Sequence, residues 1–265
     1  RNRDLHRRLE RTLPAVHLDQ DRRRNPHQSN RRSKIIVHAT LVDDGELLEV
    51  HERWAENVVC ALARMGGQVV GIVASQPAKL AGAMNIASSE KAARFVQVCD
   101  AFNIALITLV DVPGFLPGVE QEHSGIIRHG AKLLYAYCNA TVPRIQVILR
   151  KAYGGAYIVM DSQSIGADVS LAWPTNEIAV MGAEAAANVI FRREIERSEN
   201  PDQTRRDRLR EYEDELMHPY YAAERGLVDE VIDPAETRSR LIGTLQMLGT
   251  KQSTLDHRKH GNQPQ

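Results

Sequence analysis

Two adjacent glycines, Gly154 and Gly155, follow a strongly apolar run and lie within the segment from Arg150 to Tyr157. Glycine adopts φ angles that other residues avoid and lets a ligand come close to the backbone. Two successive N–H groups in such a turn can point at one oxygen atom and stabilise negative charge on it. A tight strand-to-helix turn without a ligand has the same sequence pattern. The pair therefore indicates either an oxyanion hole or a structural turn.

A second unusual segment, residues 111–118, reads DVPGFLPG and contains two Pro-Gly pairs. Loops that follow the strands of α/β proteins commonly hold ligand sites, and proline stiffens such a loop. A rigid turn without a ligand is the alternative. Asp111 and His129 are candidates for acid-base groups. No nucleophile elbow, phosphate-binding loop, zinc-protease motif or dinucleotide fingerprint accompanies them, so these two residues alone indicate no reaction.

The elements that would position these segments alternate along the chain. Short apolar runs at residues 69–74, 104–110 and 145–149 predict strands, and helical patterns separate them. This rhythm is typical of an α/β fold with a buried sheet. Both unusual segments come directly after a predicted strand.

Periodic apolar residues predict the helices. Ser88 or Ser89 is expected to cap the first helix, and Ser124 the second. The predicted buried stripes are Ala92, Phe95, Val96 and Cys99 on the first helix, and Ile127, Ala131, Leu134 and Cys138 on the second. Residues 233–236, DPAE, predict a cap, a first-turn proline and a capping-box glutamate at the start of a last helix that runs to about Leu248. Residues 196–216 are highly charged and predict a solvated helix at the periphery.

The charge balance excludes a global attraction to nucleic acid or to an anionic membrane. Lys plus Arg and Asp plus Glu are both 34, so the formal net charge is zero. Residues 1–34 are basic and lack apolar periodicity, so we expect a poorly ordered, solvated segment there rather than a nucleic-acid arm. The predicted organisation is this segment, one folded domain at residues 35–250, and a C-terminal tail at residues 251–265.

Cysteine spacing and hydropathy predict a cytoplasmic protein. Cys60, Cys99 and Cys138 lie far apart and form no metal-binding pair, so we expect buried, reduced thiols. No apolar run reaches the roughly 18 residues that a membrane span needs. The first residues are charged, unlike a signal peptide.

Beyond these features, the sequence resembles the β subunits of acetyl-CoA and propionyl-CoA carboxylases, from Leu41 to its end. The matching stretches are residues 41–46, 87–95, 110–118, 172–175 and 259–262. The resemblance implies a crotonase-like (ClpP/crotonase) α/β fold and identifies the chain as the C-terminal domain of a carboxyltransferase. Such an enzyme normally has an N-terminal and a C-terminal domain. The N domain of one subunit faces the C domain of another, commonly in a ring-shaped hexamer, so the active site would lie at a subunit interface.

The resemblance also implies a reaction. Carboxybiotin, on a partner carrier protein, gives its carboxyl group to the α-carbon of an acyl-CoA through an enolate, and backbone donors stabilise the oxygens that gain negative charge. The implied partners are the acyl-CoA substrate, a biotin carboxylase and biotin carrier α subunit, and the N-terminal domain, with no metal in this domain.

The resemblance implies site residues as well. The implied donors are Gly155 and Ala156, assigned to the biotin carbonyl. The implied pocket residues are Gly154, Tyr157, Ile158, Pro113, Gly114 and Phe115. The aliphatic Ile158 favours acetyl-CoA or a broader acyl range over strict propionyl specificity, because propionyl-preferring relatives have Asp there.

Three alternatives remain at this stage. A simple crotonase enzyme such as an enoyl-CoA hydratase needs carboxylates that activate water, and no acidic pair occurs at the expected loops. A biotin-dependent decarboxylase or transcarboxylase subunit would share the fold and the motifs. A non-catalytic assembly subunit or fragment would lack the N domain. The absence of a four-cysteine cluster places the chain with the zinc-free β subunits.

Overall fold

The computed structural model describes residues 40–253 and 261–264. All of them belong to one compact unit. The segment predicted to be poorly ordered, residues 1–34, lies outside the described residues, as does part of the predicted tail. The first tail residue, Lys251, forms an ion pair with Asp168 at 2.7 Å.

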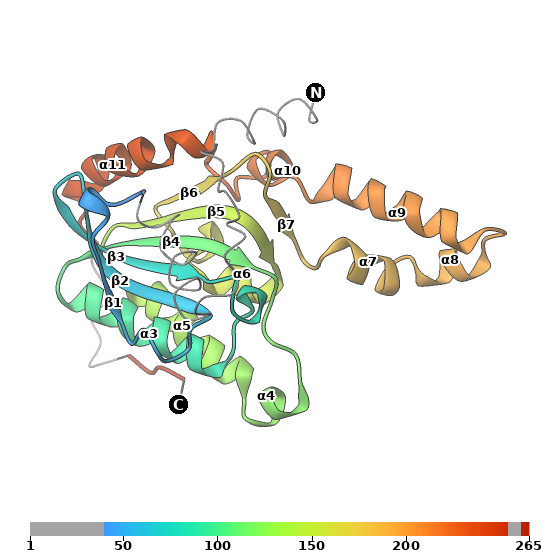
Figure 1. The fold of residues 1–265 in the computed structure, drawn as a ribbon, viewed down its shortest axis with the longest axis horizontal. Coiled ribbons are helices and arrows are strands. Elements are labelled where there is room, and N and C mark those ends of the chain that lie inside the picture. Colours follow the sequence, from blue (N-terminus) through green and yellow to red (C-terminus); the bar gives the residue numbers. More distant parts are fainter. Residues whose placement is uncertain (1–39, 254–260, 265) are drawn as a thin grey trace, which may run out of the picture. The chain divides into compact units, whose positions relative to one another are not determined.

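One mixed sheet of eight strands organises the described residues (Figure 1). Its order is β1-β2-β3-β4-β5-β6-β8. The short strand β7 pairs with the last residues of β5, after the part of β5 that pairs with β6. The pairs β1–β2 and β2–β3 are antiparallel, and the other pairs are parallel. The strands are β1 (Leu47–Val50), β2 (Val58–Met65), β3 (Gln68–Ser75), β4 (Ala105–Val112), β5 (Arg144–Tyr153), β6 (Val169–Ala172), β7 (Glu177–Ala179) and β8 (Glu230–Val231). The three strands predicted from apolar runs are confirmed as β3, β4 and β5, which are continuous runs because helices cover both faces of the sheet.

Helices pack on both sides of the sheet. In Figure 1, α3 and α5 cover one face and α11 the other. Phe95, Leu133 and Tyr157 belong to the core on the first side, and Leu241 with Leu245 to the core on the second. The helices are α3 (Ile86–Ala101), α4 (Val119–His123), α5 (Ile126–Asn139), α6 (Gly154–Val159), α7 (Ala183–Val189), α8 (Arg192–Arg197), α9 (Pro201–Leu216), α10 (Pro219–Ala223) and α11 (Thr237–Met247).

The prediction that a serine caps α3 is wrong. Asn85 is the cap: its side chain accepts a hydrogen bond from the Ser88 N–H at 2.9 Å, and the Ser88 hydroxyl accepts one from the Asn85 N–H at 2.9 Å. Ser88 is thus the third residue of the helix and the second half of a capping box. The predicted buried stripe, from Ala92 to Cys99, is confirmed.

The start of α5 and its buried face also differ from the prediction. The residue before the helix is Gly125, with a left-handed φ of 81°, rather than Ser124. The buried residues of α5 are Ile126, Gly130, Leu133, Ala136 and Tyr137, about one position away from the predicted stripe. Ile127 and Cys138 are exposed, so the expectation of three buried cysteines is wrong for Cys138 and right for Cys60 and Cys99.

The predicted cap Asp233 is confirmed, but it caps a short 3₁₀ turn, and the capping box predicted for Glu236 does not form at the start of α11. The Asp233 side chain accepts a hydrogen bond from the Ala235 N–H at 2.8 Å. A short 3₁₀ turn at Pro234–Glu236 leads directly into α11, which ends at Met247, one residue before the predicted Leu248.

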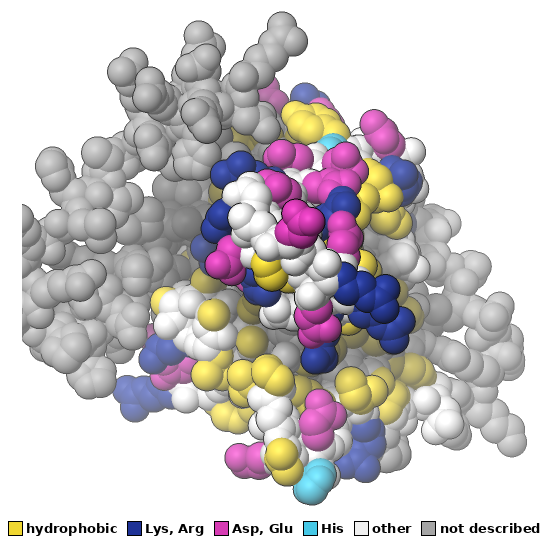
Figure 2. Space-filling view, turned by 90° about the vertical axis from the view of Figure 1, so that its right-hand side faces the viewer, with side chains coloured by type: hydrophobic (Ala, Val, Ile, Leu, Met, Phe, Trp, Pro, Cys, Tyr) yellow, Lys and Arg dark blue, Asp and Glu magenta, His cyan; other side chains and the backbone are white. Residues whose placement is uncertain are grey.

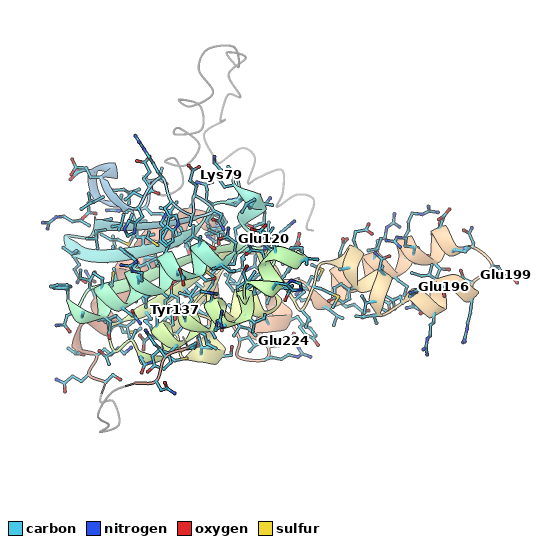
Figure 3. All side chains as sticks on the ribbon, turned by 90° about the horizontal axis from the view of Figure 1, so that it is seen from below. Lys79, Glu120, Tyr137, Glu196, Glu199 and Glu224 are labelled. Atoms are coloured by element: carbon cyan, nitrogen blue, oxygen red, sulfur yellow. The ribbon has the colours of Figure 1, made fainter. Side chains whose placement is uncertain are left out.

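Helices α7, α8 and α9 form an arm that extends away from the sheet (Figure 1). The charged helix predicted at residues 196–216 is confirmed only as α9, from Pro201, because residues 196 and 197 belong to α8 and residues 198–200 are not helical. Glu196 and Glu199 lie near the far end of the arm (Figure 3). Seen end-on in Figure 2, the arm carries intermixed acidic and basic side chains, and hydrophobic side chains gather below it. Within the arm, α7 and α9 pack against each other through a small hydrophobic cluster that includes Ala186 and Tyr212.

Candidate active site

The two glycines form the predicted turn between a strand and a helix. Tyr153 ends β5, and Gly154 begins α6 with a left-handed φ of 58°. A Cβ on Gly154 would lie 2.9 Å from the carbonyl oxygen of Val180. Both the backbone angle and this close approach require glycine, so Gly154 is explained by the fold itself.

Gly155 has a different environment. Its φ is not positive, and a Cβ there would find its nearest neighbour, the Cε2 atom of Phe115, at 3.8 Å. No neighbouring atom would prevent a side chain at this exposed position. Because residue 155 is a glycine, the space next to its backbone stays open. Gly155 and Ala156 lie in the first turn of α6, where N–H groups have no acceptor within the helix, and the Tyr153 side chain does not cap it. The N–H group of the exposed Gly155 is therefore accessible to a ligand oxygen, whereas Ala156 is fully buried in the described chain.

The loop after β4 is held against the start of α3. The Met84 N–H donates to the Gly114 carbonyl at 3.0 Å, and the Leu116 N–H donates to the Met84 carbonyl at 2.7 Å. Further along the loop, the Gln121 side chain accepts a hydrogen bond from the Ile86 N–H at 3.2 Å. These bonds hold the backbone on both sides of Phe115 in one place.

The structure brings the two unusual segments of the sequence together at Phe115, whose ring reaches Gly155 from the β4 side. Pro113 and Gly114 supply the backbone that carries this ring out of β4. Ile158, on α6, is 41% exposed and accessible to a ligand. The predicted site residues thus occupy the carboxyl ends of two neighbouring parallel strands.

The predicted donor Ala156 and the predicted pocket residue Tyr157 have side chains that contribute through packing. Ala156 and Tyr157 are buried in the core beneath the turn. Burial raises the pKa of Tyr157 to about 12. Both side chains fix the orientation of α6.

The candidate acid-base residues have structural partners. Asp111 pairs with Arg150 at 3.1 Å and accepts a hydrogen bond from the Lys151 N–H at 3.3 Å, which ties the end of β4 to β5. His129 contacts Glu90 at 2.8 Å, between α5 and α3. Neither is joined to Gly155 by a described contact.

A buried polar ladder supports α6 from below, and the sequence reasoning missed it. Thr108, Gln146 and Ser170 lie side by side on β4, β5 and β6. The Gln146 amide donates to the Met160 carbonyl at 2.8 Å, and the Ser170 hydroxyl donates to the Gln146 amide oxygen at 2.8 Å. In the sequence, each of these three residues is a polar residue with apolar neighbours on both sides, and this pattern could have indicated the ladder.

A buried ion pair adjoins this ladder. Arg144 of β5 contacts Asp161, just after α6, at 2.8 Å, and their side chains are 6% and 0% exposed. Burial raises the pKa of Asp161 to about 6, although the Arg144 charge opposes this shift. The C-terminal end of α6 is therefore fixed to the sheet by contacts that exclude water.

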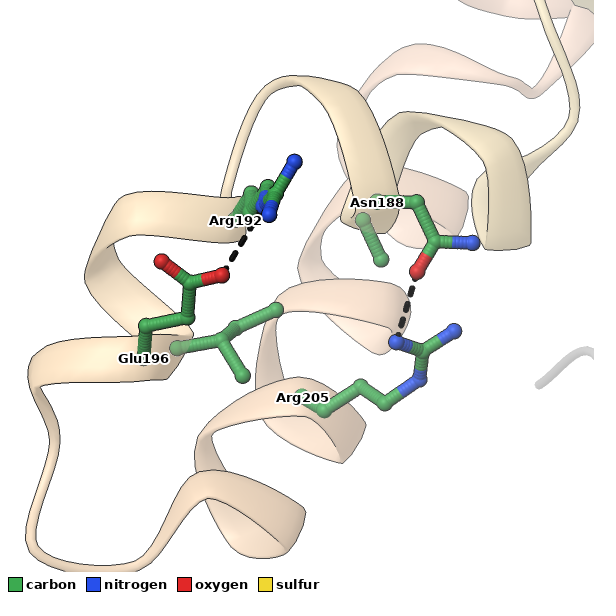
Figure 4. A pocket seen from close by; sticks show the side chains of 6 residues that line it. Asn188, Arg192, Glu196 and Arg205 are labelled. Carbon is green, nitrogen blue, oxygen red and sulfur yellow. Dashed lines mark hydrogen bonds and ion pairs between the residues drawn. The ribbon is translucent and has the colours of Figure 1, made fainter.

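A hollow of about 360 Å³ on the arm is a separate feature (Figure 4). It is lined by Ala187, Asn188, Arg192, Ile195, Glu196 and Arg205. Its polar groups pair with one another, Arg192 with Glu196 and Arg205 with Asn188, both at 2.8 Å. These groups are already satisfied, so the hollow is a weaker candidate than the α6 turn.

The described residues contain neither a candidate metal cluster nor a candidate membrane-spanning helix. No group of three or more His, Cys, Asp or Glu side chains there could hold a metal ion. Within the same part of the chain, no helix combines the length and the apolar character needed to cross a membrane.

Comparison with known proteins agrees with this geometry. The family described as the carboxyl transferase domain matches residues 12–263. The chain is 57% identical over 228 residues to the methylmalonyl-CoA carboxyltransferase 12S subunit of Propionibacterium freudenreichii subsp. shermanii, covering 86% of this chain and 44% of that relative. It is 55% identical over 244 residues to the propionyl-CoA carboxylase beta chain of Saccharopolyspora erythraea, covering 91% and 44%.

A solved structure of the transcarboxylase 12S hexamer, with methylmalonyl-CoA bound, has a TM-score of 0.84 and 56% identity, over 86% of this chain and 44% of that chain. The chain thus spans less than half the length of these relatives. The matches cover 86% to 91% of this chain. The chain has the crotonase-like carboxyltransferase fold and belongs to the carboxyl transferase domain family.

Proposed function

We propose that this chain forms the C-terminal half of a carboxyltransferase active site, which moves a carboxyl group from biotin to the α-carbon of a short-chain acyl-CoA. The observation that carries the proposal is the first turn of α6, where the helix supplies no acceptor for the N–H groups of Gly155 and Ala156, and where Gly155 is exposed and not required by the fold. The family membership supports the same reaction class.

The chemistry follows from where charge develops. Biotin, attached to a carrier partner, supplies the carboxyl group: its N1–carboxyl bond breaks and its ureido oxygen gains negative charge. The ureido anion takes up the α-proton of the acyl-CoA, and the resulting enolate forms the new carbon–carbon bond. The N–H groups of Gly155 and Ala156 would donate to the ureido oxygen, because oriented backbone donors stabilise such charge without reorganisation. The absence of a Cβ at residue 155 lets the oxygen approach the backbone. Ile158, on the same turn, would line the acyl pocket and favour acetyl-CoA or a broader acyl range.

The proposed site needs a second half. The relatives are about twice as long as this chain, and the proposed N-terminal half would hold the acyl-CoA thioester. One of these relatives assembles as a hexamer, which supports an oligomeric arrangement of the two halves. The proposed partners are a biotin carboxylase and biotin carrier subunit in the cytoplasm. A transcarboxylase would use the same half-site with a different carboxyl donor and acceptor, and one similar relative has that function.

The test uses a reconstituted carboxyltransferase, defined as this chain combined with an N-terminal carboxyltransferase half and a biotin-loaded carrier. The chain alone should transfer little carboxyl group, and the N-terminal half should restore transfer. In the reconstituted enzyme, Gly155→Pro removes one donor, so kcat should fall by about a hundredfold to a thousandfold.

Gly155→Ala is the matched control, because it keeps the N–H and its methyl group meets no atom closer than 3.8 Å within the chain. Its loss should be smaller than that of Gly155→Pro. Thermal unfolding must show that both variants fold, since proline restricts the residue before it. A folded Gly155→Pro variant with normal turnover would exclude Gly155 as a donor.

A further inference from the structure

Gly130 is a glycine in the middle of α5, and it is buried. Glycine weakens the interior of a helix because it loses more backbone freedom than other residues when the helix forms. The φ of Gly130 is not positive, so the backbone conformation does not require it. The reason for this glycine must lie in what surrounds it.

The ring of Phe115 fills the space that a side chain at Gly130 would need. A Cβ on Gly130 would lie 2.6 Å from Cζ and 3.0 Å from Cε1 of this ring, closer than real Cβ contacts allow. The Phe115 backbone cannot easily retreat, because hydrogen bonds on both sides of it attach the loop to Met84. A side chain at position 130 would therefore move the ring rather than the loop.

The same ring reaches the proposed site. Its Cε2 atom lies 3.8 Å from the Cβ position of Gly155. The α6 turn is itself fixed from the sheet side by the bond between Gln146 and Met160 at 2.8 Å and by the ion pair of Asp161. The ring is thus confined between α5 and a turn that has little freedom to move away.

We infer that Gly130 is a positioning residue of the proposed site, acting through Phe115. The missing side chain lets the ring lie against α5, and this sets how much space remains in front of the Gly155 N–H. A methyl group at position 130 pushes the ring away from α5 and over the first turn of α6, where it hinders the ligand oxygen. This inference rests on the proposed function, since it assigns a role toward the Gly155 donor.

The test is Gly130→Ala in the reconstituted carboxyltransferase. We expect kcat/KM for carboxyl transfer to fall by about tenfold to a hundredfold, the effect of a misplacement of about 1 Å near reacting atoms. The double variant Gly130→Ala/Phe115→Leu should recover to the level of Phe115→Leu alone, because leucine leaves room for the methyl group. Gly243→Ala is the matched control: Gly243 is also inside a helix, α11, but its Cβ would meet nothing within 4 Å, so turnover should not change.

The outcomes separate this inference from the function on which it rests. Normal turnover of Gly130→Ala, with Gly155→Pro impaired, would overturn the positioning role alone. Failure of Phe115→Leu to rescue a folded Gly130→Ala variant would overturn it too. Normal turnover of a folded Gly155→Pro variant would reject the proposed function, whatever Gly130→Ala does.

A second variant covers the case in which Gly130→Ala does not fold. Phe115→Leu alone removes the edge of the ring beside Gly155 without crowding α5. We then expect KM for the biotin-loaded carrier to rise several-fold while the thermal unfolding midpoint changes little, a split that a purely structural role would not give. An unchanged KM and kcat would show that the ring does not border the site and would overturn the inference.

Discussion

Arg144 and Arg208 each pair with a carboxylate, but they do so in two different regions of the molecule. Arg144 contacts Asp161 at 2.8 Å beneath the α6 turn, where the two side chains are 6% and 0% exposed. Arg208 contacts Glu194 at 2.6 Å on the arm, where the side chains are 34% and 47% exposed. The distances are similar, and the difference lies in the water around the two pairs.

Because of this difference in solvent exposure, the region around α6 is held in one geometry, whereas the arm is not. A buried charge without its partner is strongly destabilising, so the Arg144 pair and the ladder at Gln146 permit only one position of α6. An exposed pair gains little, because water and salt screen it. The proposed donors, Gly155 and Ala156, are in the first region, and backbone donors stabilise charge only when they are preorganised.

The largest expected effect comes from Arg144→Met. The substitution leaves Asp161 buried without its cation, so the free energy of unfolding should fall by about 3 to 5 kcal/mol at neutral pH. Urea unfolding of the 265-residue chain measures this loss. Adding Asp161→Asn should restore part of the stability, because it removes the buried charge and asparagine tolerates the left-handed φ of 59° at this position.

The pH dependence of this variant gives an independent check. The pKa of Asp161 is already raised to about 6 by burial, and the loss of Arg144 should raise it further. A folded-state pKa above the unfolded value means that the folded protein binds more protons, so stability rises as pH falls from 7 toward 5. The difference between the parent and Arg144→Met should therefore shrink in this window. A constant difference would mean that Asp161 is not the source of the loss.

A smaller effect, on selectivity, is expected from Ile158→Asp in the reconstituted carboxyltransferase. Ile158 lies two residues beyond Ala156 and leaves the backbone donors in place, so we expect acyl preference to narrow toward propionyl-CoA without loss of turnover. An aliphatic wall discriminates by only about 1 to 3 kcal/mol per methylene, whereas a carboxylate enclosed in the assembled site must be desolvated.

The measurement is kcat/KM for acetyl-, propionyl- and butyryl-CoA. Ile190→Asp is the control, because Ile190 is an isoleucine of the arm that is 56% exposed and distant in sequence from the donors. It should leave all three values unchanged. If Ile158→Asp lowers the three values by one common factor, Ile158 is a packing residue and the proposed acyl range is wrong.

Much of the α6 region could be predicted from the sequence. The buried strands are continuous apolar runs, and the turn after β5 is marked by Gly154 and Gly155. Within the charged segment at residues 196–216, the exposed helix α9 was predicted correctly from Pro201 on, because composition alone separates a solvated face from a core. The roles of the individual pocket residues were implied by resemblance and remain proposals.

Other features depend on contacts between distant residues. The buried face of α5 was predicted about one position away, because the ring of Phe115 occupies the space beside Gly130 and brings this glycine into the core. Asn85, Ser88 and Ser89 are all residue types that can cap α3. Asn85 is the cap because it exchanges two hydrogen bonds with Ser88, which the sequence alone does not reveal. The partner of Asp161 is 17 residues away in the chain, and no local pattern identifies such a pair.

The smallest expected effect is that of Arg208→Ala on the arm. Arg208 bridges Glu194 and Glu211 and lies 5.8 Å from the centre of the Phe191 ring, all on α8, α9 and the turn between α7 and α8. We expect no resolvable change in global unfolding, because these contacts are exposed and screened. Hydrogen exchange should still become faster for amides of α8, which open without unfolding the sheet, and stay unchanged for β4 and β5. If the substitution lowers global stability as Arg144→Met does, the arm unfolds together with the core, and the distinction between the two regions fails.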